Sequence, residues 1–198
     1  MSTIALTGST GFVGRQILRV LIERGCQVRV VKRPGSPLPD WADQNRIEIA
    51  DTPDLFAASQ SQLETLLAGC DTLIHAAWYA EPGQYLHSPR NVDCLIGTLR
   101  LAQALQTNSG QRFVGIGTCF EYDVDAGWLK PDTPLLPKTP YAAAKVAAFQ
   151  MLSQLLPSAG LSFAWCRLFY LYGEGEDARR LVPYLRAKLA AGEPAELT

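Results

Sequence analysis

Short apolar stretches alternate with longer stretches of helical periodicity along most of the chain. Residues 3–7 (TIALT) are apolar and partly β-branched, which predicts a buried strand. From Phe12 onward, apolar residues recur at helical spacing, and this helix is expected to end at Gly25. Further strands are predicted at 28–31, 46–50, 71–77, 112–117 and 161–169, and further helices at 59–68, 91–106 and 141–156.

The order of these elements predicts an α/β protein. Strands and helices alternate, and the strands are apolar throughout instead of alternating between apolar and polar positions. Such strands are typical of a parallel sheet that is covered by helices on both faces. We therefore expect a doubly wound parallel sheet.

Three glycines follow the first strand in TGSTGFVG, residues 7–14. At this place one glycine permits a tight turn, a second lets a pyrophosphate approach the backbone, and a third lets the helix pack closely. The helix N-terminus also offers free N–H groups and the positive end of its dipole. The pattern predicts a dinucleotide site of the Rossmann type, although a purely structural turn is the alternative. The residues expected to hold the cofactor here are Gly8, Thr10, Gly11, Phe12, Val13 and Gly14.

The spacing G-x-x-G-x-x-G and the downstream YAAAK stretch, with Tyr141 and Lys145, resemble the extended short-chain dehydrogenase/reductase superfamily. Within it, the chain is most similar to the NAD-dependent epimerase/dehydratase branch, whose members act on nucleotide sugars. Further stretches agree with that family in order and spacing, namely 74–78 (IHAAW), 97–105 (GTLRLAQAL), 117–122 (GTCFEY) and 167–175 (RLFYLYGEG). The resemblance therefore covers nearly the whole chain.

The resemblance implies an enzyme that transfers a hydride to or from a nicotinamide cofactor and moves a proton at a sugar hydroxyl. It also implies two domains. Residues 1–175 form the dinucleotide-binding Rossmann domain, and residues 176–198 form only the start of a smaller substrate-binding domain. On this interpretation the chain is a fragment of a longer enzyme, and its activity as it stands is open.

Tyr141 and Lys145 are the first candidate catalytic residues. Four positions apart on a helix, they share one face. A tyrosine is a poor base at its usual pKa of about 10. A nearby ammonium is expected to lower that pKa by favouring the phenolate. The resemblance adds Thr118, whose hydroxyl would hold the substrate oxygen, and a contact from Lys145 to the nicotinamide ribose; a surface tyrosine and lysine are the alternative.

The residues after Thr118 narrow the reaction. The 4,6-dehydratases that this chain resembles carry Asp-Glu there, and this chain has Cys119 and Phe120. Glu121 comes one place later and is expected to face the other side of the strand. A dehydratase is therefore disfavoured, which leaves a 4-epimerase or a 4-ketoreductase acting at C4 of a nucleotide-linked hexose. A non-catalytic NADP-sensing regulator and an inactive fragment remain as alternatives.

The end of the second predicted strand indicates which cofactor is used. NAD enzymes usually place an aspartate there, and NADP enzymes place a cation. This chain has Lys32 and Arg33, and arginine suits phosphate geometry. NADP(H) is therefore favoured and NAD(H) is possible, with a solvated basic turn as the alternative. The resemblance adds further cofactor contacts at Asp51, Thr52, Ala76, Ala77, Trp78 and Leu168.

The substrate pocket departs from the family pattern more than the cofactor site does. Cys94 stands where the family has an asparagine, with Asn91 nearby, and Tyr170 replaces a substrate-binding asparagine. His75 is expected to be a buried structural histidine. The residues predicted to line the pocket are Tyr79, Cys119, Phe120 and Tyr170.

Composition limits the other function classes. The 198 residues carry a net charge of −1, which argues against nucleic acid as a partner, and no apolar run has the length of a membrane span. The five cysteines form no C-x-x-C pair, which favours a reduced, cytoplasmic protein, and with two histidines no metal site is expected.

Assembly is the last property that the sequence predicts. The resemblance implies a homodimer through the helices at 91–106 and 141–156. These helices carry more apolar residues than one packed face needs, including Leu95, Leu99, Phe149 and Leu152.

Overall fold

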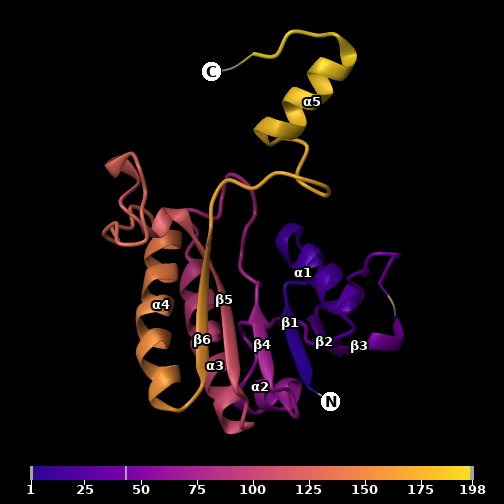
Figure 1. The fold of residues 1–198 in the computed structure, drawn as a ribbon, viewed down its shortest axis with the longest axis vertical. Coiled ribbons are helices and arrows are strands. Elements are labelled where there is room, and N and C mark those ends of the chain that lie inside the picture. Colours follow the sequence, from indigo (N-terminus) through magenta and orange to yellow (C-terminus); the bar gives the residue numbers. More distant parts are fainter. Residues whose placement is uncertain (1, 43, 197–198) are drawn as a thin grey trace. The chain divides into compact units, whose positions relative to one another are not determined.

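The computed structural model describes residues 2–42 and 44–196. Its centre is a six-stranded sheet in the order β3-β2-β1-β4-β5-β6, in which every pairing is parallel. The carboxyl ends of the strands therefore meet at one edge, the upper edge in Figure 1. The strands are β1 (Thr3–Thr7), β2 (Gln27–Lys32), β3 (Ile47–Asp51), β4 (Thr72–His75), β5 (Arg112–Thr118) and β6 (Ser162–Leu168).

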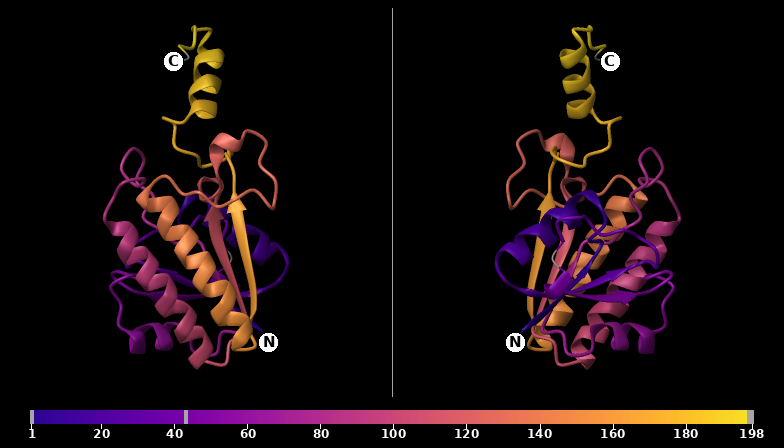
Figure 2. Two further views of the ribbon diagram at one scale, coloured as in Figure 1. Left: turned by 90° about the vertical axis from the view of Figure 1, so that its left-hand side faces the viewer. Right: turned by 90° about the vertical axis from the view of Figure 1, so that its right-hand side faces the viewer.

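Helices cover both faces of the sheet, as the sequence predicts. Helix α3 packs against both α2 and α4 on one face, and Figure 2 shows α1 on the opposite face. The strand order reverses at β1, which pairs with β2 on one side and β4 on the other; ligands of such sheets bind at this point. The helices are α1 (Phe12–Glu23), α2 (Gln60–Leu67), α3 (Arg90–Thr107), α4 (Pro140–Ser158) and α5 (Leu181–Ala191).

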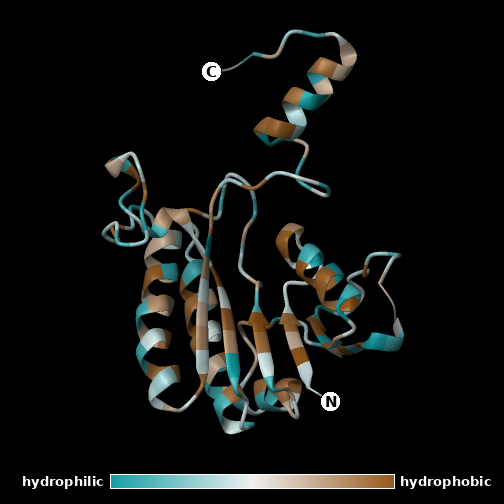
Figure 3. Cartoon of the chain, viewed as in Figure 1, coloured by the Kyte–Doolittle hydropathy of each residue, from teal (hydrophilic) through white to brown (hydrophobic). Residues whose placement is uncertain are grey.

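The hydrophobic core follows from the apolar strands of the sequence. Figure 3 shows hydrophobic residues concentrated along β1 and β4, in the middle of the sheet. On the α2–α4 face, Leu73, Phe113 and Leu152 are fully buried in the larger cluster of core residues. Leu6 and Leu18 lie in a second cluster beneath α1. Burial of such side chains stabilises the sheet by roughly 1.5–3 kcal/mol each.

The expectation that all strands are buried on both faces is wrong for the two edge strands. In β6, Ser162, Ala164 and Cys166 are exposed, while the residues between them face α4. In β3, Glu48 and Ile49 are also exposed. Both strands pair on one side only among the described residues, and no described helix of the sheet covers the outer face of β6. Burial therefore alternates along β6, and β3 is partly exposed.

The chain divides into two compact units, Met1–Leu168 and Phe169–Thr198. The first unit holds the whole sheet with α1 to α4. The second unit holds α5, which ends at Gly192 in the left-handed conformation that favours glycine. The interpretation of residues 176–198 as the start of a substrate domain, with a boundary at residue 175, stays a prediction.

Candidate active site

The glycine loop between β1 and α1 is packed too tightly for side chains at two positions. Gly8 has φ +75°, and a Cβ there would lie 2.6 Å from the backbone nitrogen of Ala77. A Cβ at Gly14 would lie 1.9 Å from the carbonyl oxygen of Gly8. At Gly11 the nearest atom would be 3.4 Å away, an ordinary contact. Gly8 and Gly14 thus hold the loop against β4 and let α1 start directly behind it.

The N-terminus of α1 is open to an anion. Its N-cap residue Gly11 provides no side-chain oxygen for the first N–H groups of the helix. Those groups need an acceptor, and the positive end of the helix dipole lies at the same place. These features of the structure fit the diphosphate of a dinucleotide, which such loops bind through backbone N–H groups. Gly8, Thr10, Gly11, Phe12, Val13 and Gly14 would hold it, together with the backbone of Ala76 and Ala77.

The structure brings together the three predicted catalytic residues. Thr118 is the last residue of β5, and Tyr141 and Lys145 lie in the first turns of α4, which Thr139 caps by accepting the N–H of Ala142. The hydroxyl of Thr118 lies close enough to the Tyr141 phenol to act on its pKa. The Nζ of Lys145 donates to the carbonyl of Ile116 at 2.7 Å. The phenol, the hydroxyl and the ammonium therefore meet at the carboxyl end of β5.

The pKa of Tyr141 departs from the sequence expectation. Burial raises the pKa of Tyr141 well above its usual value, although the Thr118 hydroxyl acts in the opposite direction. Burial also lowers the pKa of Lys145, to about 7. The expected lowering of the tyrosine pKa by Lys145 is therefore wrong. The ammonium contacts Ile116 and the ring of Trp78 instead of the phenol.

Aromatic side chains pack around Tyr141 and Lys145. The Nζ of Lys145 lies 3.7 Å from the ring centroid of Trp78. The ring of Tyr141 meets the ring of Tyr85 edge to face, at 4.9 Å between centroids, and that of Trp78 at 6.2 Å. Asn91, on α3, is buried and accepts the indole N–H of Trp78 at 2.9 Å. Trp78, predicted as a backbone contact of the cofactor, thus contributes its side chain to the centre as well.

Glu121 was predicted to follow Thr118 on a strand, and this expectation is wrong. The chain leaves β5 at Thr118, and Cys119–Glu121 forms a 3-10 turn instead. The carboxylate of Glu121 forms a buried ion pair with Arg167 at 2.6 Å. Cys119 is buried and Phe120 is half-buried in the same turn, directly beside Thr118. The sequence reasoning excluded Glu121 as an acid but missed this network.

His75 is confirmed as a buried structural residue. Its Nδ1 shares a hydrogen bond with Thr7 at 2.8 Å, and its Nε2 shares one with Thr98 at 2.9 Å. Burial lowers the pKa of His75 to about 3, so the ring is neutral at physiological pH. It therefore ties β1 and β4 to α3 behind the site.

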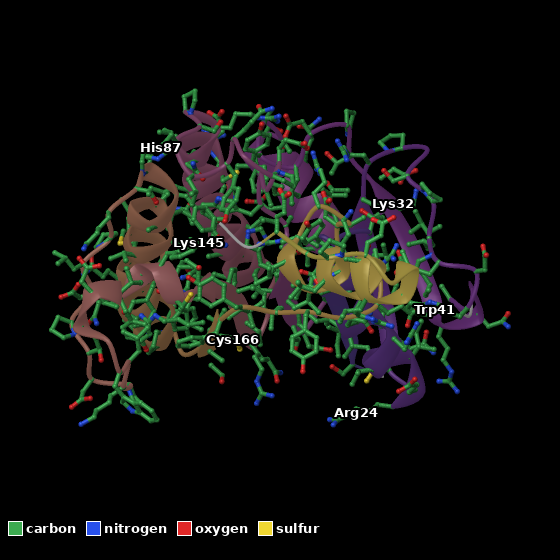
Figure 4. All side chains as sticks on the ribbon, turned by 90° about the horizontal axis from the view of Figure 1, so that it is seen from above. Arg24, Lys32, Trp41, His87, Lys145 and Cys166 are labelled. Carbon is green, nitrogen blue, oxygen red and sulfur yellow. The ribbon has the colours of Figure 1, made fainter. Side chains whose placement is uncertain are left out.

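The predicted cofactor-selecting residues lie at the end of β2. The Nζ of Lys32 forms an ion pair with Asp51 at 3.1 Å, and Arg33 is exposed. Figure 4 shows Lys32 and Lys145 well apart across the carboxyl edge of the sheet. Buried Thr52 follows Asp51, and its N–H donates to the carbonyl of Lys32. A cavity of about 390 Å³ adjoins Lys32, lined also by Ser36, Leu38, Pro39, Asp40, Ala42 and Ile49.

The remaining predicted residues are placed as follows. Tyr79 follows Trp78; its N–H donates to Cys94 Sγ at 3.4 Å, and its hydroxyl donates to Gln84 at 3.2 Å. Leu168 is half-buried and ends β6, pairing with Thr118. Tyr170 is 80% exposed and belongs to the second unit, so its predicted substrate contact stays a prediction.

Two further features concern metals and membranes. Among residues 2–42 and 44–196, the structure contains no group of three histidine, cysteine or acidic side chains that could hold a metal ion. None of the helices formed by these residues has both the length and the apolar character needed to cross a membrane.

Comparison with known proteins gives one family and several chemistries. A family model described as the NAD dependent epimerase/dehydratase family matches residues 4–198. A dTDP-6-deoxy-L-talose 4-dehydrogenase (NAD(P)(+)) of Kitasatospora kifunensis is 28% identical over 207 residues, covering 98% of this chain and 62% of that protein. A dTDP-glucose 4,6-dehydratase of Streptomyces niveus is 25% identical over 207 residues, covering 96% and 60%.

The solved structures agree on the fold. A UDP-N-acetylglucosamine 4-epimerase from Methanobrevibacter ruminantium M1 has a TM-score of 0.80 and 24% identity, over 97% of this chain and 64% of that one. This chain thus spans less than two thirds of the length of each of these proteins. Their names describe a dehydrogenase, a dehydratase and an epimerase, so the choice among these reactions depends on the residues of the site.

Proposed function

Because the chain belongs to the NAD-dependent epimerase/dehydratase family, we propose that the whole protein is an enzyme acting on a nucleotide sugar. The reaction is oxidation or reduction at C4 of a nucleotide-linked hexose, as a 4-ketoreductase or a 4-epimerase. The observation that carries this proposal is the meeting of Thr118, Tyr141 and Lys145 at the end of β5. Both the talose dehydrogenase and the 4-epimerase named above act at C4 according to their names.

The nicotinamide cofactor supplies or accepts the hydride when it is bound. In the reduction direction, Tyr141 donates its phenolic proton to the C4 oxygen as that oxygen gains negative charge. A raised pKa suits this role, because the phenol enters the reaction protonated. Thr118 donates a second hydrogen bond to the same oxygen and orients it.

Lys145 binds the nicotinamide ribose and keeps positive charge beside Tyr141 after the proton has left. Oxidation reverses these transfers, with Tyr141 taking the proton from the C4 hydroxyl. The same residues therefore serve a reductase and an epimerase.

Elimination of water from the sugar needs an acid that this site does not offer. The positions after Thr118 hold a thiol and a phenyl ring, Cys119 and Phe120. These two residues and Tyr79 are the ones proposed to border the sugar. The carboxylate that follows, Glu121, is fully buried in its ion pair with Arg167. This favours simple redox chemistry over the dehydratase reaction of the Streptomyces niveus relative. The presence of all three catalytic side chains likewise disfavours a non-catalytic NADP-sensing regulator.

NADP(H) is the proposed cofactor, with NAD(H) as the alternative. Lys32 is held by Asp51, so the exposed Arg33 is the cation best placed to meet a 2′-phosphate. The adenosine would lie near Asp51 and Thr52, beside the cavity next to Lys32. The talose dehydrogenase named above uses either cofactor according to its name.

We further propose a cytoplasmic homodimer that pairs through α3 and α4. Val92, Ile96 and Met151 expose apolar surface on these helices. Of the residues predicted for this face, Leu152 is fully buried in the core and supplies no surface, and Phe149 is half-buried and packs against Trp165. Light scattering at micromolar concentration tests the dimer, and a monomer mass contradicts it.

A panel of nucleotide sugars tests the reaction. The protein is incubated with each sugar, with its 4-keto derivative, and with NADPH or NADH. C4 inversion and cofactor consumption are scored separately, which distinguishes an epimerase from a reductase. A protein that binds NADPH but turns over no member of the panel would contradict the enzyme and favour the regulator.

A further inference from the structure

A carboxylate is completely buried next to the proposed catalytic centre. Glu121 has no exposed surface. Its Oε1 accepts the backbone N–H of Thr118 at 2.8 Å, and its Oε2 accepts the Nε–H of Arg167 at 2.6 Å. A buried charge costs several kcal/mol unless it is paired and hydrogen-bonded. The backbone N–H of Thr118, a proposed catalytic residue, therefore helps to stabilise this buried charge.

Two positions of β5 next to Glu121 are glycines, Gly115 and Gly117. Trp165, on β6, donates its indole N–H to Glu121 Oε1 at 3.0 Å. A Cβ at Gly117 would lie 2.3 Å from the indole nitrogen and 2.4 Å from Glu121 Oε1. A Cβ at Gly115 would lie 2.3 Å from the same indole ring. These two glycines of β5 let the indole and the carboxylate approach the backbone that carries Thr118.

Thr118 is hydrogen-bonded twice to the turn that follows it, Cys119–Glu121. While Glu121 accepts the N–H of Thr118, the hydroxyl of Thr118 accepts the N–H of Phe120 at 3.3 Å, which completes a capping box. Since the hydroxyl oxygen accepts this bond, its hydrogen remains for the Tyr141 phenol or a substrate oxygen. The direction of the Thr118 hydroxyl therefore depends on this turn, which the bond from the Thr118 N–H to Glu121 helps to close.

Glu121 also lies near Lys145: the Nζ of Lys145 is 5.9 Å from the ring centroid of Trp165, whose indole N–H binds Glu121. Burial lowers the pKa of Lys145 to about 7, and the charge of Glu121 acts in the opposite direction. The other titratable groups facing Lys145 are Cys94 on α3 and His75 on β4. His75 is neutral, and burial raises the pKa of Cys94, so both lack charge at neutral pH. Glu121, whose own partner is Arg167, is therefore the anionic group that supports the ammonium form.

We propose that Glu121 is a positioning residue of the reaction proposed above, fixing the backbone of Thr118 and supplying the buried negative charge that faces Lys145. It does not touch the sugar. It acts through Thr118, whose hydroxyl it orients, and through Lys145, whose ammonium form it favours. The proposal rests on the proposed function only for its effect on turnover, because both contacts exist without substrate.

Lysine Nζ NMR on the substrate-free protein tests this directly. A Lys145→Arg variant assigns the Lys145 signal, and its titration is followed in wild type, Glu121→Gln, Glu121→Asp and Glu48→Gln. Glu121→Gln should lower the titration midpoint of Lys145 by about one pH unit, since an opposite charge is lost. Glu121→Asp keeps the charge and should hold the midpoint near wild type. Glu48→Gln, an exposed carboxylate on β3, is the matched control.

Turnover gives the second readout. With the midpoint moved from about 7 to about 6, the ammonium fraction at pH 7 falls about fivefold, and kcat of Glu121→Gln should fall at least as much. Glu121→Asp should recover part of kcat, and its deficit should not depend on pH. An unchanged Lys145 midpoint in folded Glu121→Gln overturns the proposal. Absence of turnover in wild type instead refutes the proposed function and leaves the titration result standing.

Folding of the variants is checked by circular dichroism. If Glu121→Gln does not fold, the same titration is compared between Arg167→Met and Arg167→Met/Glu121→Gln. The second pair of variants leaves no unpaired guanidinium beside the amide. A lower Lys145 midpoint in the double variant supports the charge role, and equal midpoints overturn it.

Discussion

Two regions at the carboxyl edge of the sheet, one at the end of β5 and one at the end of β2, are built differently. At the end of β5, the polar groups around Thr118 and Lys145 are buried and bonded to one another, and the Glu121–Arg167 pair lies inside the protein. At the end of β2, Lys32 meets Asp51, whose side chain is 45% exposed, and Arg33 lies in solvent. The first region has its geometry fixed by packing. The second has few constraints on its side chains.

This difference suits two tasks. Proton and hydride transfer require reacting atoms at roughly 3–3.5 Å, so the residues that perform them gain from being held rigidly. Recognition of a phosphate by an arginine tolerates more movement, because the guanidinium can reach and rotate. A substitution should therefore cost more stability at the β5 end, and should change selectivity more at the β2 end.

The two ion pairs give the largest expected contrast. Arg167→Met removes the partner of Glu121, together with the guanidinium that lies over the Phe149 ring. It should lower the free energy of unfolding by about 3–5 kcal/mol, because an unpaired charge stays buried. Lys32→Met removes a pair whose carboxylate, Asp51, is 45% exposed, so it leaves no unpaired charge buried and should cost about 1 kcal/mol or less.

Urea unfolding of both variants measures this contrast. The comparison requires equal m-values, so that the midpoints report stability. Equal costs for Arg167→Met and Lys32→Met would contradict the distinction between a rigid and a loosely held region.

The glycine loop provides the next effect. Gly14→Ala would place a Cβ 1.9 Å from the Gly8 carbonyl, so the backbone must move at a cost of about 3 kcal/mol, with loss of cofactor binding. Gly11→Ala meets its nearest atom at 3.4 Å and should cost about 1 kcal/mol or less. Thermal unfolding and NADPH fluorescence titration compare the two variants. A Gly14→Ala protein as stable as Gly11→Ala would refute the packing explanation.

Selectivity at the β2 end is the smallest expected effect. Arg33→Ala should weaken NADPH binding about tenfold, or about 1.4 kcal/mol, with little change for NADH. Arg24→Ala removes an equally exposed arginine after α1 and controls for net charge. Tighter binding of NADH than of NADPH by the wild type would overturn the role assigned to Arg33.

The elements of the fold could largely be predicted from the sequence. The apolar strands and the helical periods set β1, α1, α3 and α4 to within a few residues. The short turn at Cys119–Glu121 could not, because GTCFEY continues the apolar pattern of β5 and its reversal depends on the capping box. The alternating burial of β6 was also missed, since it depends on which face the helices cover.

The site shows the same division. Local spacing predicted the glycine loop and the pairing of Tyr141 with Lys145 on one helix face. The Asn91–Trp78 bond and the Trp165–Glu121 bond join residues far apart in the sequence, and spacing carries no signal for such contacts. The glycines at 115 and 117 were the one available hint, because two glycines in a predicted strand indicate a close approach. The direction of the Tyr141 pKa shift was predicted wrongly, because it depends on the burial of the phenol.

The central claim, that Tyr141 exchanges the proton at C4, is tested most directly by single-turnover kinetics of Tyr141→Phe. The protein is loaded with cofactor and with the nucleotide sugar that the panel identifies. Tyr85→Phe is the matched control, since its ring meets the Tyr141 ring at 4.9 Å and would be retained. Tyr141→Phe should slow hydride transfer on the order of a hundredfold or more while cofactor binding is unchanged, and Tyr85→Phe should stay within a few-fold of wild type. Hydride transfer at nearly the wild-type rate in Tyr141→Phe would contradict the claim.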